Sequence, residues 1–419
     1  MHELKTASDL DALIDDIGDR RVVMLGEASH GTHEYYTWRT ALSQRLIREK
    51  GFSFIAVEGD WPDCYRVNRY LKAYEDGGDN VQEVLKTFDR WPTWMWANWE
   101  VAALAEWMRK YNDTLPPEQK VGFYGLDVYS LWDSMYEIVN YLEAEDPAAA
   151  TAVKKAIECF QPFQDNEHRY AQFALGQHSC RDKVLALLKE IRNKVHHAEG
   201  DREASFSTEQ NALVAVNAEK YYRSMMSFDN ESWNVRDTHM MQTLDRLLQF
   251  HGSNSKAIVW EHNTHIGDAR ATDMKQAGMI NIGQLAREKY GSSAVYLVGF
   301  GSYAGRVIAG EEWGAPMRVV DVPPAREGSI EHQLHKQSAN NRYFLFSEPE
   351  IPEAFKDKVR HRAIGVVYNP ANERFGNYVN SIMAKRYDAF VYLDETKALY
   401  PFGLPGKKGE LPDLYPFGY

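Results

Sequence analysis

The sequence predicts an α/β protein with three layers, α/β/α, built on a mainly parallel sheet and interrupted by an inserted helical unit. Two observations carry this prediction. Short apolar segments alternate with amphipathic segments in the first third of the chain, and strand patterns return in the last part after a long stretch without them. Strands that alternate with helices favour right-handed crossovers and therefore parallel pairing.

The first predicted strand is RVVMLGE (21–27), an apolar run of the kind that a parallel strand buried on both faces requires. It leads into a segment (34–50) whose apolar residues recur at helical spacing, and Gly51 is placed to cap the end of that helix. FSFIAVEG (52–59) is the second predicted strand, and VGFYGLD (121–127) is the third.

Between 146 and 253 the pattern changes to long, charged helical stretches, which we interpret as the inserted unit. Strand signals then return at 256–262, 293–302, 318–324, 343–348, 363–368 and 388–394. We therefore expect residues 1–145 and 254–419 to form the α/β core that carries the functional site. Residues 146–253 are expected to form a helical insertion that shapes the substrate cleft.

Composition excludes several classes of partner. The net charge of −12 argues against a nucleic acid or an anionic membrane surface, because both require a basic face. No apolar run approaches the roughly 18 residues of a membrane span, and the first residues lack the pattern of a signal peptide. Three cysteines without C-x-x-C spacing, Cys64, Cys159 and Cys180, predict a reducing compartment and no disulfide framework. We expect a cytoplasmic protein.

Ionisable residues stand where four of the predicted strands end. The carboxyl ends of neighbouring parallel strands line the ligand crevice of an open sheet. Any one of these residues could instead cap the helix that follows its strand. A buried carboxylate without a partner is costly, so the whole set is better explained by a shared site. The residues are Glu27 and His30, then Glu58, then Asp127, and finally Glu261, His262 and His265.

These residue types suggest hydrolysis by an activated water. An imidazole can take a proton from water while a neighbouring carboxylate orients the ring, and His30 with Glu27 fits that pairing. A second imidazole, from His262 or His265, could stabilise the developing oxyanion or protonate the leaving alcohol. The sequence lacks the G-x-S-x-G, G-x-x-x-x-G-K-[ST] and H-E-x-x-H motifs of other catalytic and phosphate-binding sites.

Two alternatives stay open. Glu27-x-x-His30 and His262-x-x-His265, with Glu58, also offer ligand types that Zn, Mn or Co accept, so a metal-dependent peptidase or amidase could use the same cluster. We predict no cofactor and no metal ligand, and a divalent metal remains the alternative. The other alternative is a binding protein for a large apolar ligand, although such binding does not need so many ionisable groups.

Aromatic residues make up 13% of the chain, and several lie in DRWPTWMWANWE (89–100). Trp94 and Trp96 in this segment are predicted to line a cleft for a large, partly apolar ligand, together with Asp127 and Glu261 as substrate-binding groups. The alternative is that these rings pack a helix against the core.

The motifs also carry a family resemblance. LGEASHGTHEYYTWRTALSQRLI, FIAVEGDWPDCYRVNRYL and EHNTHIGDAR resemble, in this order, the signatures of the erythromycin esterase family. The resemblance implies a sheet core with inserted helices and a hydrolase that opens the lactone ester of fourteen-membered macrolides. It implies that His30 is the general base, that Glu27 and Glu58 are the accompanying carboxylates, and that Arg39 is the cation on the first helix. His262 and His265 would complete the site.

The sequence therefore predicts a carboxylic ester hydrolase whose substrate is a small molecule with a bulky ester. The metal-dependent hydrolase and the non-enzymatic binder remain as alternatives.

Overall fold

The computed structural model describes residues 1–163, 166–175, 179–195, 201–226 and 230–404. The chain forms two compact units. The first, here the core unit, comprises Met1–Val57, Val67–Phe123 and Asn254–Tyr419. The second, here the helical unit, comprises Glu58–Arg66 and Tyr124–Ser253. The helical unit therefore starts earlier along the chain than the predicted insertion, and its end coincides with the predicted boundary.

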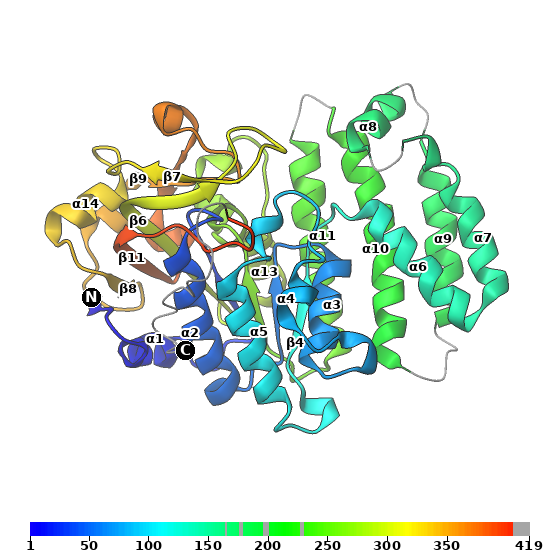
Figure 1. Cartoon of the computed structure of the whole chain (residues 1–419). Helices are drawn as coiled ribbons and strands as arrows, with labels where there is room; N and C mark the ends of the chain where they lie inside the picture. The colour runs from blue at the N-terminus through cyan, green and yellow to red at the C-terminus, as the bar shows by residue number, and fades with distance from the viewer. Residues whose placement is uncertain (164–165, 176–178, 196–200, 227–229, 405–419) are drawn as a thin grey trace. The chain divides into compact units, whose positions relative to one another are not determined.

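The sheet is mostly parallel, which confirms the predicted α/β class (Figure 1). Its strand order is β1-β8-β11-β6-β2-β5-β3-β4, and β7 pairs with β6. The strands are β1 (His2–Glu3), β2 (Val22–Leu25), β3 (Phe54–Val57), β4 (Gly122–Gly125), β5 (Ala257–Trp260), β6 (Val295–Ala309), β7 (Arg318–Val322), β8 (Arg342–Leu345) and β11 (Ala389–Thr396).

The central strands pair in parallel along β11-β6-β2-β5-β3, whereas β8 pairs antiparallel with β11. Every residue of β2, β3, β4 and β5 is buried, as expected for short strands of a sheet that is covered on both faces. Two further strands, β9 (Lys358–Arg362) and β10 (Tyr378–Ile382), form a separate antiparallel ribbon.

The predicted strand at 363–368 is wrong. The strand in this region is β9, which ends at Arg362, directly before the predicted segment. The predicted segment itself makes only isolated bridges, at Ile364 and Val367. The sequence of β9, KVRHR, has little apolar character because two of its buried side chains are polar and pair with buried glutamates. His361 pairs with Glu331, and Arg362 pairs with Glu373. An apolar pattern therefore does not reveal it.

The helices of the core unit connect these strands. They are α1 (Asp11–Ile17), α2 (His33–Lys50), α4 (Val81–Leu85), α5 (Trp99–Asn112), α12 (Asn263–Ile266), α13 (Ile282–Tyr290), α14 (Ile330–Gln337), α15 (Glu373–Gly376) and α16 (Met383–Arg386), with α3 (Trp61–Leu71) divided between the two units. The helix predicted at 34–50 is α2. Gly51 ends it in the left-handed conformation, with φ 68° and ψ 37°, which confirms the predicted cap.

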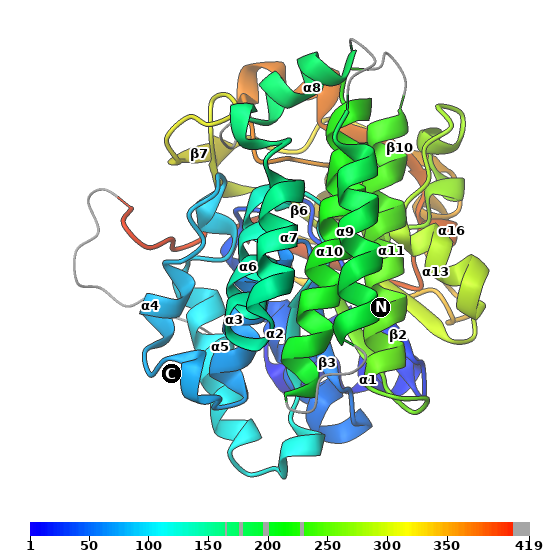
Figure 2. The same cartoon turned by 90° about the vertical axis from the view of Figure 1, so that its right-hand side faces the viewer.

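The helical unit contains α6 (Leu131–Glu145), α7 (Pro147–Ile157), α8 (Glu167–Leu175), α9 (Arg181–Val195), α10 (Arg202–Ser224) and α11 (Glu231–Phe250). The long helix α10 contacts α6, α8, α9 and α11 (Figure 2). Its buried positions include the small residues Ala212, Ala215 and Ala218, which allow neighbouring helices to approach closely. None of the helices in the described part of the chain is long and apolar enough to cross a bilayer.

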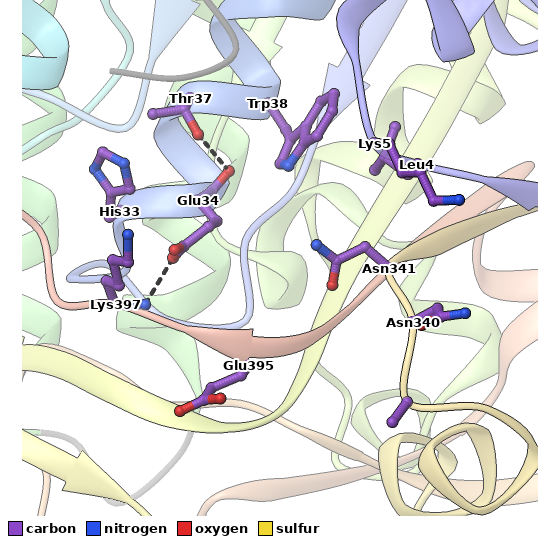
Figure 3. A pocket seen from close by; sticks show the side chains of 11 residues that line it. Leu4, Lys5, His33, Glu34, Thr37, Trp38, Asn340, Asn341, Glu395 and Lys397 are labelled. Atoms are coloured by element: carbon purple, nitrogen blue, oxygen red, sulfur yellow. Dashed lines mark hydrogen bonds between the residues drawn. The ribbon is translucent and has the colours of Figure 1, made fainter. Parts of the chain in front are cut away.

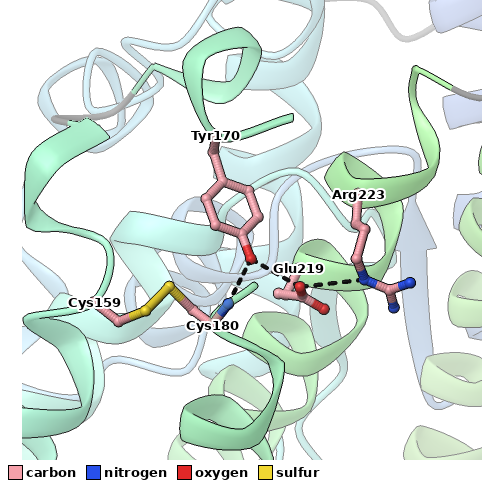
Figure 4. The surroundings of a disulfide bond; sticks show 5 residues. All are labelled: Cys159, Tyr170, Cys180, Glu219 and Arg223. Atoms are coloured by element: carbon pink, nitrogen blue, oxygen red, sulfur yellow. Dashed lines mark hydrogen bonds and ion pairs between the residues drawn. A yellow bond between two sulfur atoms is a disulfide. The ribbon is translucent and has the colours of Figure 1, made fainter. Parts of the chain in front are cut away.

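Cys159 and Cys180 form a disulfide in this unit (Figure 4). The prediction of a chain without disulfides is therefore wrong, and the cysteine count no longer supports a reducing compartment. The two residues lie just beyond the end of α7 and just before the start of α9, so helix packing rather than a local motif brings them together. The backbone N–H of Cys180 donates to Tyr170 Oη, which donates in turn to the buried Glu219. Cys64 is a buried free thiol.

Candidate active site

The ends of two neighbouring strands build the site in the core unit. β2 and β5 pair in parallel with Leu25 opposite Trp260, so the residues that follow the two strands start at the same level of the sheet. Glu27 follows β2, and Glu261 and His262 follow β5. The backbone N–H of Asn263 donates to the carbonyl oxygen of Glu27 at 2.8 Å, which ties the two loops together.

Glu27 binds His30 with one carboxylate oxygen and Arg39 with the other. His30 Nδ1 lies 2.8 Å from Glu27 Oε1, and Arg39 Nη2 donates to Glu27 Oε2 at 2.6 Å. All three side chains are buried. The carboxylate accepts the proton of Nδ1, so in the neutral ring the lone pair is on Nε2. The geometry thus leaves His30 with a basic nitrogen and a carboxylate behind it, as a general base requires.

Arg39 reaches this carboxylate from the second turn of α2. Its guanidinium carbon lies 4.6 Å from the ring centroids of both Tyr36 and Trp260, and its Nε donates to Tyr35 O. The aromatic faces replace part of the hydration that a buried guanidinium loses. Arg39, which only the family resemblance indicated, is therefore an internal residue paired to the site carboxylate and not a surface arginine.

His262 stands beside His30, with 5.0 Å between the ring centroids and 41° between the ring planes. It is the N-cap of α12, and its Nδ1 accepts a hydrogen bond from the backbone N–H of Thr264 at 3.3 Å. This pattern implies that the neutral ring carries its proton on Nε2. His262 can therefore donate a hydrogen bond from Nε2. Glu261 and His265 are also buried in this region, Glu261 directly after β5 and His265 on α12.

Glu58 and Asp127 belong to the helical unit, where both bind Arg236 of α11. Arg236 Nη2 donates to Glu58 Oε1 and to Asp127 Oδ2 at 2.7 Å each, and its Nε donates to Asp127 Oδ1 at 2.9 Å. Burial raises the pKa of Asp127, but the charge and hydrogen bonds of Arg236 outweigh that effect and lower it overall. The structure thus groups Glu58 with Asp127, and Glu27 with His30, Arg39 and His262.

Sequence reasoning missed Arg236. It lies in ESWNVRDTHM, which has an ordinary helical pattern, so the sequence carries no signal that Arg236 pairs with Glu58 and Asp127.

The two tryptophans that were predicted to contact substrate are buried. Trp94 is 1% exposed and Trp96 is 5% exposed, and Trp96 packs edge-on against Phe123 and at a tilt against Tyr36. The two rings therefore pack against the core, which was the alternative to a role in substrate binding. Trp91, in the same segment, is partly exposed.

A separate cavity of about 450 Å³ lies around the first turns of α2 (Figure 3). It is lined by polar and charged side chains from four parts of the core unit, among them His33, Glu34, Trp38, Asn341 and Lys397. None of the predicted site residues lines it. Within the described residues, no group of three or more His, Cys, Asp and Glu side chains is arranged to hold a metal ion.

Comparison with known proteins connects this geometry to a family. The family model described as erythromycin esterase matches residues 47–396, which include Glu58, Asp127, Glu261, His262 and His265. Glu27, His30 and Arg39 precede the matched residues. They are linked to the matched residues by the hydrogen bond from Asn263 N–H to Glu27 O and by the contact between the rings of His30 and His262.

Curated relatives span most of the chain at low identity. The chain is 22% identical to the erythromycin esterase type II of Escherichia coli over 387 residues, covering 83% of this chain and 86% of that protein. It is 20% identical to a putative hydrolase of Bacillus subtilis over 399 residues, covering 90% of this chain and 83% of that protein.

Solved structures show the same fold. A succinoglycan biosynthesis protein superposes with a TM-score of 0.76 at 19% identity, covering 95% of each chain. A mutant erythromycin esterase in its open conformation superposes with a TM-score of 0.68 at 16% identity, covering 93% of this chain and 94% of that one. These likenesses establish the architecture. Because the family model matches well over half of the sequence, the chain belongs to the erythromycin esterase family, a membership that supports a hydrolase acting on a small molecule.

Proposed function

We propose that this chain hydrolyses a carboxylic ester by general-base catalysis, with His30 as the base. The observation that carries the proposal is the buried series Arg39–Glu27–His30, with hydrogen bonds of 2.6 and 2.8 Å, and a second imidazole 5.0 Å from the base. A buried carboxylate that touches both a guanidinium and an imidazole is arranged to hold a ring in one tautomer and to stabilise its protonated form.

The reaction then proceeds in two steps. A water oxygen attacks the ester carbonyl carbon while the water gives one proton to His30 Nε2, and the carbonyl π electrons move onto oxygen. His262, with its proton on Nε2, donates a hydrogen bond to this oxyanion. When the tetrahedral intermediate collapses, the bond to the alcohol oxygen breaks and the proton held by His30 passes to that oxygen. The products are a carboxylic acid and an alcohol, and no other reactant is needed.

A bulky lactone is the substrate that we propose. The family description and the name of the Escherichia coli relative support a macrolide ring. The proposal requires no cofactor, since Arg39 already provides the positive charge next to Glu27 that a metal ion would provide in the metal-dependent alternative.

The test compares wild type with His30→Asn on erythromycin, following ring opening by the mass gain of one water. Each protein is assayed with and without a chelator. His335→Asn is a matched control, because His335 also pairs with a carboxylate, Asp394 at 2.7 Å, but at a partly exposed position. We expect turnover by wild type and by the control, no turnover by His30→Asn, and no effect of the chelator.

Other outcomes select the alternatives. Activity that a chelator removes and one divalent ion restores would establish the metal-dependent hydrolase. Erythromycin binding that survives His30→Asn, with no turnover of erythromycin or of simple esters by wild type, would establish a binding protein.

A further inference from the structure

Two indole rings at the surface of the core unit form an exposed pair. Trp313 is 62% exposed, and its ring lies against that of Trp91 with 4.7 Å between centroids and 57° between planes. Exposed indoles are unusual in a folded protein because their large apolar area stays in contact with water. Val367, 36% exposed, is the bridge partner of Gly310, and a Cβ on Gly310 would meet the Trp91 ring. We call Trp91 and Trp313 the aromatic pair.

The segment that carries Trp313 is attached to the residue after the proposed base. Ile308, near the end of β6, donates its backbone N–H to the carbonyl oxygen of Gly31 at 2.9 Å. The backbones are so close that a Cβ on Gly31 would lie 2.1 Å from the Ile308 carbonyl oxygen. Two residues further along, a Cβ on Gly310 would meet the Trp91 ring at 3.0 Å. Two residues of extended strand span about 7 Å.

The segment that carries Trp91 is attached to the base itself. Tyr36 donates from its hydroxyl to the carbonyl oxygen of His30 and to that of Met95, at 3.0 Å each. Trp91 precedes Met95 by four residues, and its Nε1 donates to Ala315 O at 2.9 Å, just beyond Trp313. Both halves of the aromatic pair are therefore anchored to consecutive residues of the loop that positions the base.

We infer that the aromatic pair is a substrate subsite that packs against the apolar face of the ester hydrolysed at His30. This inference rests on the proposed function. The two residues of β6 from Ile308 to Gly310 carry the strand about 7 Å away from its contact with Gly31. The subsite therefore serves substrates whose apolar part extends well beyond the reacting carbonyl, such as a large lactone. A short-chain ester would react at His30 without reaching the rings. The pair would thus set substrate preference and take no part in the chemical step.

The test compares two substrates that share the chemistry and differ in size, erythromycin and p-nitrophenyl acetate. Trp313→Ala removes the more exposed ring, and Trp313→Phe restores an aromatic face. Trp107→Ala is the matched control. Its indole stacks on Tyr111 beneath Arg48, which lies 15 residues after the start of α2 and therefore about 22 Å along the helix from the site loop.

We expect Trp313→Ala to lower kcat/KM for erythromycin on the order of tenfold, mainly through KM, and to leave p-nitrophenyl acetate unchanged. Trp313→Phe should recover most of the loss, and Trp107→Ala should show none. Equal losses on both substrates, or none on either, would overturn the subsite. A shift from dimer to monomer in Trp313→Ala on size-exclusion chromatography with light scattering would also overturn it, because the rings would then serve a second copy of the chain.

The subsite can be tested separately from the proposed hydrolysis, by measuring the binding of erythromycin. If wild type hydrolyses neither ester, equilibrium binding of erythromycin still tests the subsite. A roughly tenfold weaker Kd for Trp313→Ala, with wild-type Kd for Trp107→Ala, would support the subsite in a protein that is not an esterase. An unchanged Kd, or no binding by wild type, would remove the subsite along with the esterase.

Discussion

Arg39 donates from Nη2 to Glu27 Oε2 over 2.6 Å, and neither side chain is more than 2% exposed. The guanidinium is the cationic partner of this buried carboxylate, and the carboxylate in turn orients His30. The pair therefore serves folding and the proposed chemistry at once, and the two roles can be separated by different substitutions.

Arg39→Met leaves the Glu27 charge buried without its cation, so we expect the free energy of unfolding to fall by about 3–5 kcal/mol in urea denaturation. The double variant Arg39→Met/Glu27→Gln should recover part of this loss because it removes both charges. Arg45→Met is the control, since Arg45 pairs with the exposed Glu49 and should lose about 1 kcal/mol or less. Equal losses for Arg39→Met and Arg45→Met would contradict the internal role of Arg39.

Glu27→Gln keeps an oxygen for His30 Nδ1 and removes only the charge. We expect kcat for the hydrolysed ester to fall about 10²- to 10⁴-fold with little change in KM, because the carboxylate stabilises the protonated ring only during the reaction. Steady-state kinetics on erythromycin measures this. A change confined to KM would mean that Glu27 binds substrate and does not assist the base.

The sequence was sufficient to predict the strands that precede the candidate site residues, but not the distant residues that pair with those site residues. The strands β2 to β5 were predictable because each is a short apolar run followed at once by ionisable residues, and Gly51 marked the end of α2. Arg236 was not predictable, because it pairs with residues 178 and 109 positions away, and helical periodicity carries no information about such pairs. The Cys159–Cys180 bond escaped for the same reason.

Asn263 links the site to a buried histidine–glutamate pair, His361 and Glu331. Its Nδ2 donates to Phe300 O at 2.7 Å and to His361 Nε2 at 3.1 Å, and His361 Nδ1 lies 2.7 Å from Glu331 Oε1. Burial lowers the pKa of His361 more than the contact with Glu331 raises it.

Asn263→Ala should therefore lower the free energy of unfolding by about 3 kcal/mol, because it leaves buried donors and acceptors without partners. Asn340→Ala, at an exposed turn, is the control and should change stability by about 0.5 kcal/mol or less. Retention of wild-type stability by Asn263→Ala would show that the linkage is dispensable.

His239 of α11 gives the protein a pH-dependent stability. Burial lowers its pKa from 6.5 to about 4, so the unfolded chain binds more protons than the folded one between these values. The contribution is complete above pH 6.5 and is lost as the pH falls towards 4, which amounts to about 3 kcal/mol in total. His239→Gln should flatten this part of the curve of unfolding free energy against pH. An unaltered curve would mean that other groups cause the acid sensitivity.

The disulfide should stabilise the helical unit. It joins residues 21 positions apart, and a loop of this length corresponds to about 3 kcal/mol, which we expect the double variant Cys159→Ala/Cys180→Ala to lose in thermal unfolding. Thiol titration of the denatured wild type provides the control. One reactive thiol, that of Cys64, should appear without reductant and three with it. Three thiols without reductant would show that the bond does not form.

The strand β6 is long enough to pair with different neighbours along its length. Its first residues, Val295–Val298, pair with β2, whereas its last residues, Gly305–Ala309, extend beyond β2 and pair antiparallel with β7 of the same sheet. Gly305, with φ 146° and no room for a Cβ beside Thr396, is the first residue of β6 that pairs with β7. Insertions or deletions in the connection between β6 and β7 would reshape this hairpin without shifting the register of β2, because β2 pairs only with the first residues of β6. The hairpin can therefore vary in length while β2, the strand that leads to Glu27 and His30, keeps its pairing with β5 and β6.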